Sequence, residues 1–434
     1  MAQRGIREFD GKRLLARYWS KYMENVPPFP GQMVLVTPET DLSMLEREHP
    51  WLSQGKLVVK PDQLFGKRGK HGLVKVAASF DEAAQWIKER MGVETTVGKV
   101  TDKLTNFLIE PFVPHEGEYY IAIKSNRDGD TLYFSNHGGV EIEAVWETVA
   151  EIQVGVMEDI DMLDVASRLP PDTPPDKRQL LADFACGLLK LYRGLGFTYL
   201  EINPFVLSDH TIVPLDLVAR IDDTAHFELG DTWGDLTFPA PFGRKLSAEE
   251  AYIKDMDEKS GASLKLTVLN PHGRVWTLVA GGGASVVYTD TIVDLGADAE
   301  LANYGEYSGN PSTGETYEYA KTVLDLMTRE KDPQGRPKFL LIGGGIANFT
   351  DVAKTFTGIT MALKEYKQKL RDTDVRIFVR RGGPNYEQGL RLMKELGEEL
   401  GVPIDVYGPE MHMTRIVDLA LKDRASVSAR KGNR

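Results

Sequence analysis

Residues 199–217 read YLEINPFVLSDHTIVPLDL, two apolar segments that carry polar residues and are joined by a short turn. Successive side chains of a strand point to opposite faces, so Glu201 and Asn203 share one face while their apolar neighbours point to a core. The turn at Leu207–Thr211 brings Asp216 back on the adjacent strand. Hard oxygen ligands on neighbouring strands are what Mg²⁺ requires when it bridges phosphates, whereas acids buried without a cation are costly. The alternative is a pair of surface strands.

A second signal lies upstream, where Lys60 ends the apolar strand Lys56–Lys60. The basic, glycine-punctuated loop Lys67–Gly72 follows it and leads into the strand Leu73–Val76. A loop that carries amides and cations between two strands can close over a triphosphate. An ordinary charged hairpin tip has the same composition, so this signal alone leaves both interpretations open.

The third signal is the strand Asn106–Phe112, which contains Glu110-Pro111 near its end. Proline donates no hydrogen bond, so the strand is left with an unpaired edge there. Backbone groups at such a hinge can bind an adenine edge, and Glu118 could accept the ribose hydroxyls. A simple strand terminator is the alternative.

The two parts of the chain differ in their pattern. Over residues 1–245, strands separated by short turns, such as Ile121–Ser125 and Leu132–Ser135, predict an α+β domain with antiparallel sheet. Over residues 246–434 a strand–glycine–helix unit recurs, which predicts an α/β domain with a doubly wound, flavodoxin-like parallel sheet. The strands expected there are Arg274–Ala280, Phe339–Ile342, Val375–Val379 and Pro403–Tyr407, with a hairpin over Leu264–Ala280. The chain's first 18 residues predict an amphipathic helix with Ile6, Leu14, Leu15 and Tyr18 inward, rather than a transit peptide.

Composition limits the classes of function. The net charge of −12 argues against a nucleic-acid surface, because phosphate backbones attract basic proteins. The longest apolar runs are of strand length, so no membrane segment is expected. A single cysteine, Cys186, excludes an internal disulfide and fits a reducing compartment such as the cytoplasm, and its apolar surroundings predict core packing.

Two glycine-rich loops in the second half are candidates for an anion site. Gly343–Thr350 opens one helix and Arg380-Arg381-Gly382-Gly383 opens another, each after the carboxyl end of a strand. Free amides at helix N-termini and arginine forks bind carboxylates. Tight turns without a ligand are the alternative, and Arg380 could equally be a solvated or interface charge.

The three signals in residues 1–245, taken in their order, resemble the ATP-grasp family, and specifically its acyl-CoA synthetase branch. Longer segments are similar to the ATP-citrate lyase family, and specifically to its ATP-grasp, citrate-binding subunit with a CoA-ligase-type second domain. These segments are Asn106–Pro114, Tyr199–Pro204, Ser260–Leu266, Val279–Tyr288, Asn303–Gly309 and Phe378–Tyr386.

The resemblance implies a set of site residues. The nucleotide contacts it implies are Lys60, Arg68, Gly69, Pro111, Val113, Glu118 and Asp216. The metal ligands are Asn203 and Asp216, with an additional cation site at Asp257, Ser260 and Ala262. The citrate contacts are Gly309, Asn348, Thr350, Tyr366 and Arg381.

The resemblance also implies ATP, Mg²⁺ and coenzyme A, the last shared with a partner. Such enzymes pass phosphate through a histidine to citryl phosphate, form citryl-CoA, and cleave it to acetyl-CoA and oxaloacetate, for lipid synthesis or in the reductive TCA cycle. None of the eight histidines lies in a Gly-His-Ala-Gly-type loop, and His412 is expected to begin a helix. The phosphohistidine and a citrate-synthase-like cleavage domain are therefore expected on a larger partner subunit, in a hetero-octamer, and no catalytic residue is assigned to this chain.

Three other functions are compatible with parts of this pattern. The large subunit of a citryl-CoA synthetase shares the same motifs. A succinyl-CoA synthetase β-subunit fits less well, because the Asn348 and Arg381 loops suit a larger anion. A non-catalytic nucleotide-binding scaffold has no need of the set Lys60, Glu118, Asn203 and Asp216.

Overall fold

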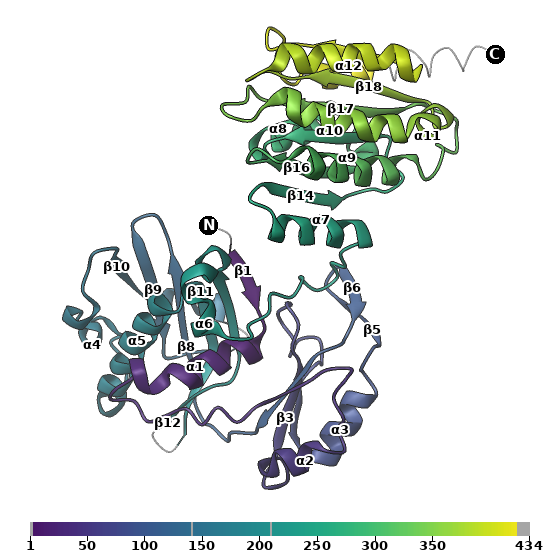
Figure 1. Cartoon of the computed structure of the whole chain (residues 1–434). Coiled ribbons are helices and arrows are strands. Elements are labelled where there is room, and N and C mark those ends of the chain that lie inside the picture. Colours follow the sequence, from purple (N-terminus) through teal and green to yellow (C-terminus); the bar gives the residue numbers. More distant parts are fainter. Residues whose placement is uncertain (1–2, 140–141, 209–210, 423–434) are drawn as a thin grey trace. The chain divides into compact units, whose positions relative to one another are not determined.

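The computed structural model of the chain describes residues 3–139, 142–208 and 211–422 (Figure 1). The packing divides the chain after Lys245 into two compact units, and each has its own hydrophobic core. The short 3-10 helices are η1 (Pro50–Ser53), η2 (Ile142–Thr148), η3 (Ile160–Met162), η4 (Asp223–Ala225) and η5 (Asp298–Glu300).

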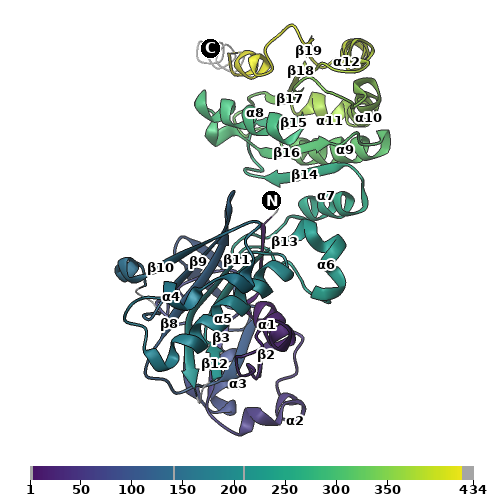
Figure 2. The same cartoon turned by 90° about the vertical axis from the view of Figure 1, so that its left-hand side faces the viewer.

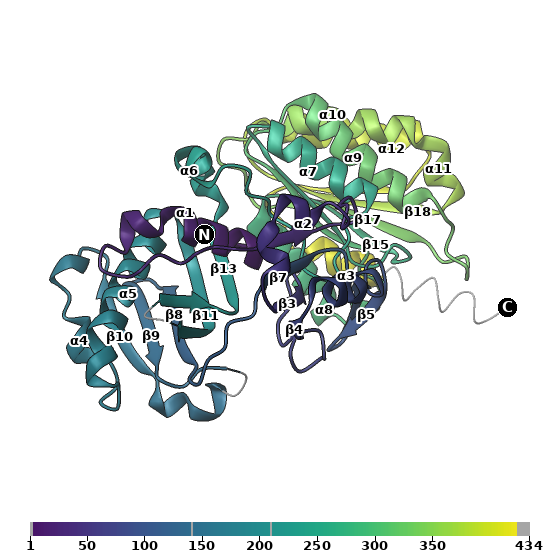
Figure 3. The same cartoon turned by 90° about the horizontal axis from the view of Figure 1, so that it is seen from below.

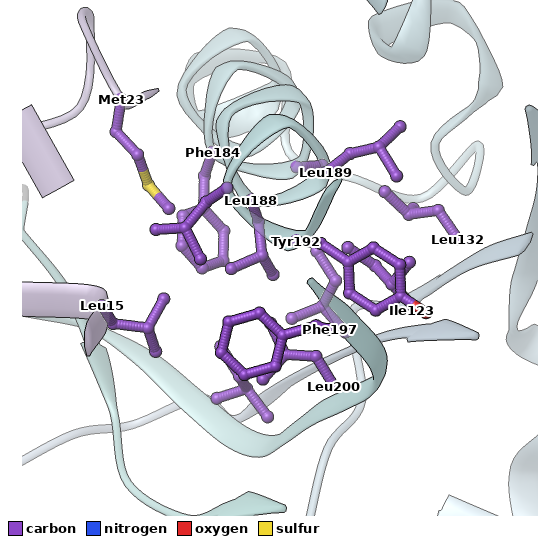
Figure 4. Close-up of a cluster of buried hydrophobic side chains, with 14 of the residues drawn as sticks. Leu15, Met23, Ile123, Leu132, Phe184, Leu188, Leu189, Tyr192, Phe197 and Leu200 are labelled. Atoms are coloured by element: carbon purple, nitrogen blue, oxygen red, sulfur yellow. The ribbon is translucent and has the colours of Figure 1, made fainter. Parts of the chain in front are cut away.

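The first unit is built on a seven-stranded antiparallel sheet. Its order is β1 (Gln3–Ile6), β13 (Leu217–Asp222), β11 (Phe197–Ser208), β8 (Tyr119–Ser125), β9 (Gly129–Ser135) and β10 (Ala150–Gly155), with β12 (Thr211–Pro214) also beside β11. Helices α1 (Glu8–Tyr22) and α5 (Pro175–Gly194) cover one face, and α4 (Val165–Arg168) and α6 (His226–Trp233) lie nearby. Figure 4 shows the core, where Leu15 and Phe184 of the two helices meet Ile123 and Leu200 of the sheet.

A second, four-stranded sheet of the first unit has the order β2 (Val34–Val36), β7 (Phe107–Pro111), β3 (Leu57–Pro61), β4 (Lys75–Ala78). Helices α2 (Leu45–Glu48) and α3 (Phe80–Lys88) pack against it, as seen from below in Figure 3. Ser79 caps α3 in a reciprocal capping box with Glu82, which explains why the helix starts there. Strands β5 (Glu94–Val97) and β6 (Val100–Lys103) form a separate hairpin.

The second unit contains a six-stranded sheet of order β14 (Ser263–Val268), β16 (Asn303–Ser308), β15 (Val275–Ala280), β17 (Lys338–Gly344), β18 (Val375–Arg380), β19 (Ile404–Tyr407). All pairs are parallel except β14–β16. The five parallel strands thus follow the flavodoxin-like order 2-1-3-4-5. Both β15 and β17 are buried along their whole length, as expected for strands covered on two faces.

Helices cover both faces of this sheet (Figure 2). On one face lie α7 (Ala248–Lys259), α9 (Thr313–Thr328), α10 (Val352–Glu365), α11 (Lys367–Asp372) and α12 (Tyr386–Leu400); on the other lie α8 (Gly282–Asp294) and the helical residues 415–422. Among the described residues, no helix is both long and apolar enough to cross a membrane.

The predicted fold class is confirmed, an α+β unit followed by an α/β unit with a doubly wound parallel sheet. Three local predictions are wrong. Residues 3–6 form a strand, and helix α1 runs from Glu8 to Tyr22 instead of starting at the N-terminus. The second of the two strands expected within residues 199–217 is interrupted after Pro214. The expected hairpin over Leu264–Ala280 does not form, because β16 lies between β14 and β15.

Candidate functional site

A cavity of about 560 Å³ lies in the first unit, and its wall is built from both sheets. Lys60 comes from β3 and Pro111 from β7, whereas Asn203 comes from β11. The volume is in the range of small-molecule sites. All seven residues predicted to contact the nucleotide line this cavity: Lys60, Arg68, Gly69, Pro111, Val113, Glu118 and Asp216.

The interruption between β12 and β13 shapes the floor of the cavity. The amides of Leu215 and Asp216 both donate to the Pro204 carbonyl oxygen, at 2.9 and 3.3 Å, and the Asn203 amide donates to the Asp216 carbonyl oxygen at 3.0 Å. The Leu215 carbonyl oxygen is thereby left for two buried lysines, and the Asp216 carboxylate pairs with Arg68. A continuous strand could have used the Leu215 carbonyl oxygen in the sheet ladder instead.

Glu8, at the start of α1, holds the two predicted phosphate-binding cations together. Its Oε1 atom lies 2.7 Å from Lys60 Nζ, and its Oε2 atom lies 2.6 Å from Arg68 Nη2. Glu8 is buried, as are both cations. Burial alone would raise the pKa of Glu8, but Lys12, Lys60 and Arg68 outweigh it and hold that pKa far below its ordinary value.

Lys12, one helical turn after Glu8, is the counterpart of Lys60. Both ammonium groups lie near Glu8 Oε1, at 2.8 Å from Lys12 and 2.7 Å from Lys60, and both donate to the Leu215 carbonyl oxygen, at 3.1 and 2.5 Å. They pair with different oxygens of Glu110, Lys12 with Oε1 at 2.6 Å and Lys60 with Oε2 at 3.1 Å. Lys12 can therefore stay paired with Glu8 and Glu110 when Lys60 turns toward a phosphate.

The residues Glu8, Lys12 and Glu110 were not predicted for this site, and neither was Asp62. Asp62 follows β3 and accepts hydrogen bonds from the amides of Glu8 (2.9 Å) and Phe9 (3.0 Å), so it caps α1 from a distant segment. A signal was present in the sequence: Glu8 and Lys12 lie on the same helical stripe as Leu15 and Trp19, both buried. Charged residues on an inward stripe need buried partners, which the sequence alone could not identify.

Val113 and Glu118 lie at the adenine side predicted for the cavity. His115 connects them, since its Nδ1 atom lies 2.8 Å from the Val113 carbonyl oxygen and its Nε2 atom 3.4 Å from a Glu118 carboxylate oxygen. A Cβ atom at Gly139 would lie 2.3 Å from a Glu118 carboxylate oxygen, and the φ of +92° at this position favours glycine. The roles of these residues toward adenine and ribose stay predictions.

The oxygen donors in the cavity fit a hard divalent cation. Asn203 Oδ1 accepts from the Gly139 amide at 2.6 Å, and Asp216 and Glu201 also line the cavity. Within the described ranges no group of three His, Cys, Asp or Glu side chains could hold a metal by itself. Mg²⁺ is usually held by one or two carboxylates together with phosphates and water, so the predicted ligands Asn203 and Asp216 suit a metal that arrives with the nucleotide.

The predicted second cation site, Asp257, Ser260 and Ala262, forms one turn at the end of α7. Ser260 Oγ accepts from the Ala262 amide at 2.9 Å, while the Asp257 carboxylate accepts from the Leu264 amide at 2.8 Å and pairs with Lys265. The three residues are close to each other, but the carboxylate already has two partners. A cation role for this turn stays a prediction.

Four of the predicted citrate contacts lie at the carboxyl edge of the parallel sheet. Gly309 follows β16, Asn348 and Thr350 lie in the loop after β17, and Arg381 follows β18. The last two loops are joined, because the Ala347 amide donates to the Gly382 carbonyl oxygen at 2.9 Å. The strand order reverses between β15 and β17, so the loop after β17 borders the usual ligand site of such sheets and Arg381 lies one strand further along.

The adjacent residues Arg380 and Arg381 differ sharply in their contacts. Arg380 donates through Nε, Nη1 and Nη2 to the carbonyl oxygens of Met411 (2.9 Å), Gly344 (3.0 Å) and Pro409 (3.2 Å). It is therefore a structural residue rather than a solvated or interface charge. The side chain of Arg381 makes one hydrogen bond to the described residues, from Nη1 to the Gly345 carbonyl oxygen at 2.6 Å, and burial lowers the pKa of its guanidinium group. Arg381 is thus the arginine that keeps donors for a ligand.

Tyr366 does not lie with the other predicted citrate contacts. It follows α10, a 14-residue helix that starts beside Asn348 and Thr350 and runs back along the sheet. At 1.5 Å per residue, the two ends of this helix are roughly 20 Å apart. Tyr366 donates instead to Asp325 at 3.3 Å, and its role toward citrate stays a prediction.

Comparison with known proteins supports both halves of this picture. The family model for the ATP-citrate synthase ATP-grasp domain matches residues 2–233, and the model for the citrate-binding part of ATP citrate lyase matches residues 244–423. A solved structure of ATP citrate lyase from Methanothrix soehngenii in complex with citrate and coenzyme A is 58% identical, with a TM-score of 0.89, covering 97% of this chain and 100% of that one.

Curated relatives fall into two groups. ATP-citrate synthase alpha chain protein 2 of Oryza sativa is 49% identical over 97% of this chain and 99% of its own length. ATP-citrate synthase of Bos taurus is 53% identical over 98% of this chain, but only 39% of the bovine protein is covered, so the chain spans about two fifths of that relative's length. With both family models matched in order and a subunit-sized relative covered end to end, the chain belongs to the ATP-citrate lyase family.

Proposed function

We propose that this chain is the ATP-grasp, citrate-binding subunit of an ATP-citrate lyase. Residues 1–245 bind Mg-ATP and residues 246–434 bind citrate. With a larger partner subunit, the chain converts citrate, ATP and coenzyme A into acetyl-CoA, oxaloacetate, ADP and phosphate.

One observation carries the proposal. The seven residues expected from the resemblance to contact the nucleotide come from distant parts of the chain, yet all of them line one cavity, together with Asn203. A scaffold that binds no metal-nucleotide has no reason to collect two cations and several oxygen donors there. Four of the five expected citrate residues likewise share one edge of the second sheet.

The chemistry assigned to this chain is binding and charge compensation. Lys60 and Arg68 neutralise the transferred phosphoryl group and its neighbours, and Mg²⁺ held by Asn203 and Asp216 would supply further compensation of the phosphate charge. Arg381 and the amides of the 345–350 loop hold the carboxylates of citrate. The phosphoryl group goes to a histidine of the partner and then to a citrate carboxylate, coenzyme A displaces phosphate to give citryl-CoA, and the partner cleaves this thioester.

The large subunit of a citryl-CoA synthetase remains the alternative. The names of the relatives favour the lyase. The size of the partner subunit distinguishes the two enzymes, because their partners differ in domain content: a co-purifying chain of about 600 residues with a citrate-synthase-like end means lyase. We further propose a cytoplasmic hetero-octamer whose acetyl-CoA serves lipid synthesis, or whose reaction serves the reductive TCA cycle.

The test measures binding and turnover with the purified chain alone. We expect calorimetry to detect Mg-ATP and citrate, and we expect no oxaloacetate release until the partner is added. Asp216→Ala should lower turnover of the assembled enzyme by orders of magnitude and leave citrate affinity intact, whereas Asp128→Ala, at an exposed turn, should change neither. Oxaloacetate release by the chain alone, or loss of citrate binding in Asp216→Ala, would contradict the proposal.

A further inference from the structure

Two buried polar atoms near the carboxyl edge of the second sheet have no hydrogen-bond partner in the described part of the chain. They are the Tyr307 hydroxyl and Arg381 Nε. Tyr307 is 1% exposed and Arg381 4% exposed. A buried donor or acceptor without a hydrogen bond lowers the stability of the fold. Such atoms often belong to a site whose ligand-bound conformation differs from its ligand-free one.

The two residues are neighbours across strand ends. Arg381 lies above the end of β17, since a Cβ atom at Gly344 would be 2.6 Å from Arg381 Nη1 and 2.9 Å from the Ala280 carbonyl oxygen. Ala280, at the end of β15, is the register partner of Tyr307 on β16. The guanidinium group therefore reaches over Gly344 toward the strand pair that carries Tyr307.

The groups are chemically complementary. The Nε–H group of Arg381 can only donate, and a tyrosine hydroxyl can accept. Burial raises the pKa of Tyr307 to about 12, despite the opposing effect of Arg381, so the hydroxyl is neutral at physiological pH. The Tyr307 ring is fixed by the Tyr319 ring of α9, with centroids 6.0 Å apart, so its hydroxyl has a defined position.

We infer that Tyr307 is a positioning residue for Arg381: when the guanidinium leaves the Gly345 carbonyl oxygen to grip a carboxylate of citrate, its Nε–H donates to the Tyr307 hydroxyl. This inference rests on the proposed citrate site. Nη1 and Nη2 of Arg381 then remain for the bidentate contact with the carboxylate. The orientation of the guanidinium group is set by Tyr307 on β16 rather than by the loop that contains Gly345.

Tyr307→Phe tests the inference, because it removes one atom and fills the same space. Citrate affinity should fall about tenfold, the size expected for a lost hydrogen bond to a charged group. The melting temperature of the free chain should not fall, because the hydroxyl has no partner to lose there. Tyr319→Phe is the matched control: its hydroxyl donates to the Lys265 carbonyl oxygen at 2.8 Å, so this variant should lose stability and keep its citrate affinity.

A double variant shows whether Tyr307 acts through Arg381. In an Arg381→Lys background, which lacks the Nε–H, adding Tyr307→Phe should not weaken citrate binding further. An equal tenfold loss in that background would overturn the positioning role, and so would unchanged citrate affinity in Tyr307→Phe alone. If the unmodified chain fails to bind citrate, the proposed function fails instead, which is a separate result.

Discussion

At the scale of the residue, identical neighbours can have opposite roles. Arg380 donates to carbonyl oxygens from all three of its side-chain nitrogens, whereas Arg381 donates from one. The sequence could place both arginines after a strand and before a helix, and resemblance favoured Arg381. It could not reveal that Arg380 is buried, because its acceptors at Met411 and Pro409 lie about 30 positions away in the chain.

The arginine pair gives a prediction about stability and binding. Arg380→Lys keeps the charge but loses most of three buried hydrogen bonds, so the free energy of unfolding should fall by about 2–4 kcal/mol with citrate affinity of the folded protein unchanged. Arg381→Lys should lower citrate affinity about 10- to 100-fold and hardly change stability. Urea unfolding and calorimetry on both variants measure the two effects. Weaker citrate binding in Arg380→Lys alone would mean that the roles are reversed.

At the scale of the element, helix α1 links the chain's start to the cavity. Its buried stripe joins apolar Leu15 and Trp19 to charged Glu8 and Lys12, and Asp62 caps its first turn from the end of β3. The amphipathic period of this helix was predictable from the sequence. Its start was not, because the residue that caps it is more than 50 positions away and Arg7 at the N-cap makes no side-chain cap.

Asp62 gives this element a pH dependence. Burial, and then the nearby Glu8 carboxylate, raise the pKa of Asp62 to about 6. Because the folded pKa lies above the unfolded value, the contribution of Asp62 to stability is full below about pH 4 and is lost as pH rises through 6. This shift in the pKa of Asp62 corresponds to a loss of up to about 3 kcal/mol in the free energy of unfolding.

Asp62→Asn should remove this loss. The difference in unfolding free energy between the variant and the original protein should therefore rise in favour of the variant by up to about 3 kcal/mol between pH 4 and 6.5. A constant offset from the changed helix cap does not affect this rise. Denaturant titrations over this pH range measure the difference. Parallel pH profiles for the protein and Asp62→Asn would contradict the assignment.

At the scale of the whole molecule, the division after Lys245 separates two kinds of sheet. The change from antiparallel hairpins to repeated strand–glycine–helix units was visible in the sequence, and so was the class of each half. Strand order was harder to predict. Strands β14 and β15 are consecutive and joined by a turn, but they do not pair with each other, because β16 lies between them. Pairing between distant strands leaves no local pattern to read.

The two units should respond to different ligands. Hydrogen exchange followed by mass spectrometry should show citrate protecting peptides that contain Gly309, the 345–350 loop and Arg381, whereas Mg-ATP should protect peptides around Lys60, Arg68 and Asp216. Opening reactions are suppressed where a ligand contacts the native state, which is the basis of this expectation. Citrate protection around Tyr366 instead of around Arg381 would contradict the placement of citrate at the carboxyl edge of the parallel sheet.

The insertion of β16 has a consequence for how the second unit forms during synthesis. Strands β14 and β15 are made first, and the turn at Asn270–Gly273 favours a hairpin between them. Both native neighbours of β15 are made later, so this strand, which is fully buried in the folded protein, leaves the ribosome with two open edges. A non-native β14–β15 pairing can satisfy one edge meanwhile, and β16 must displace it after helix α8 is complete. Until β16 pairs with β15, the open edges of β15 can pair with other chains, so aggregation is favoured in that interval.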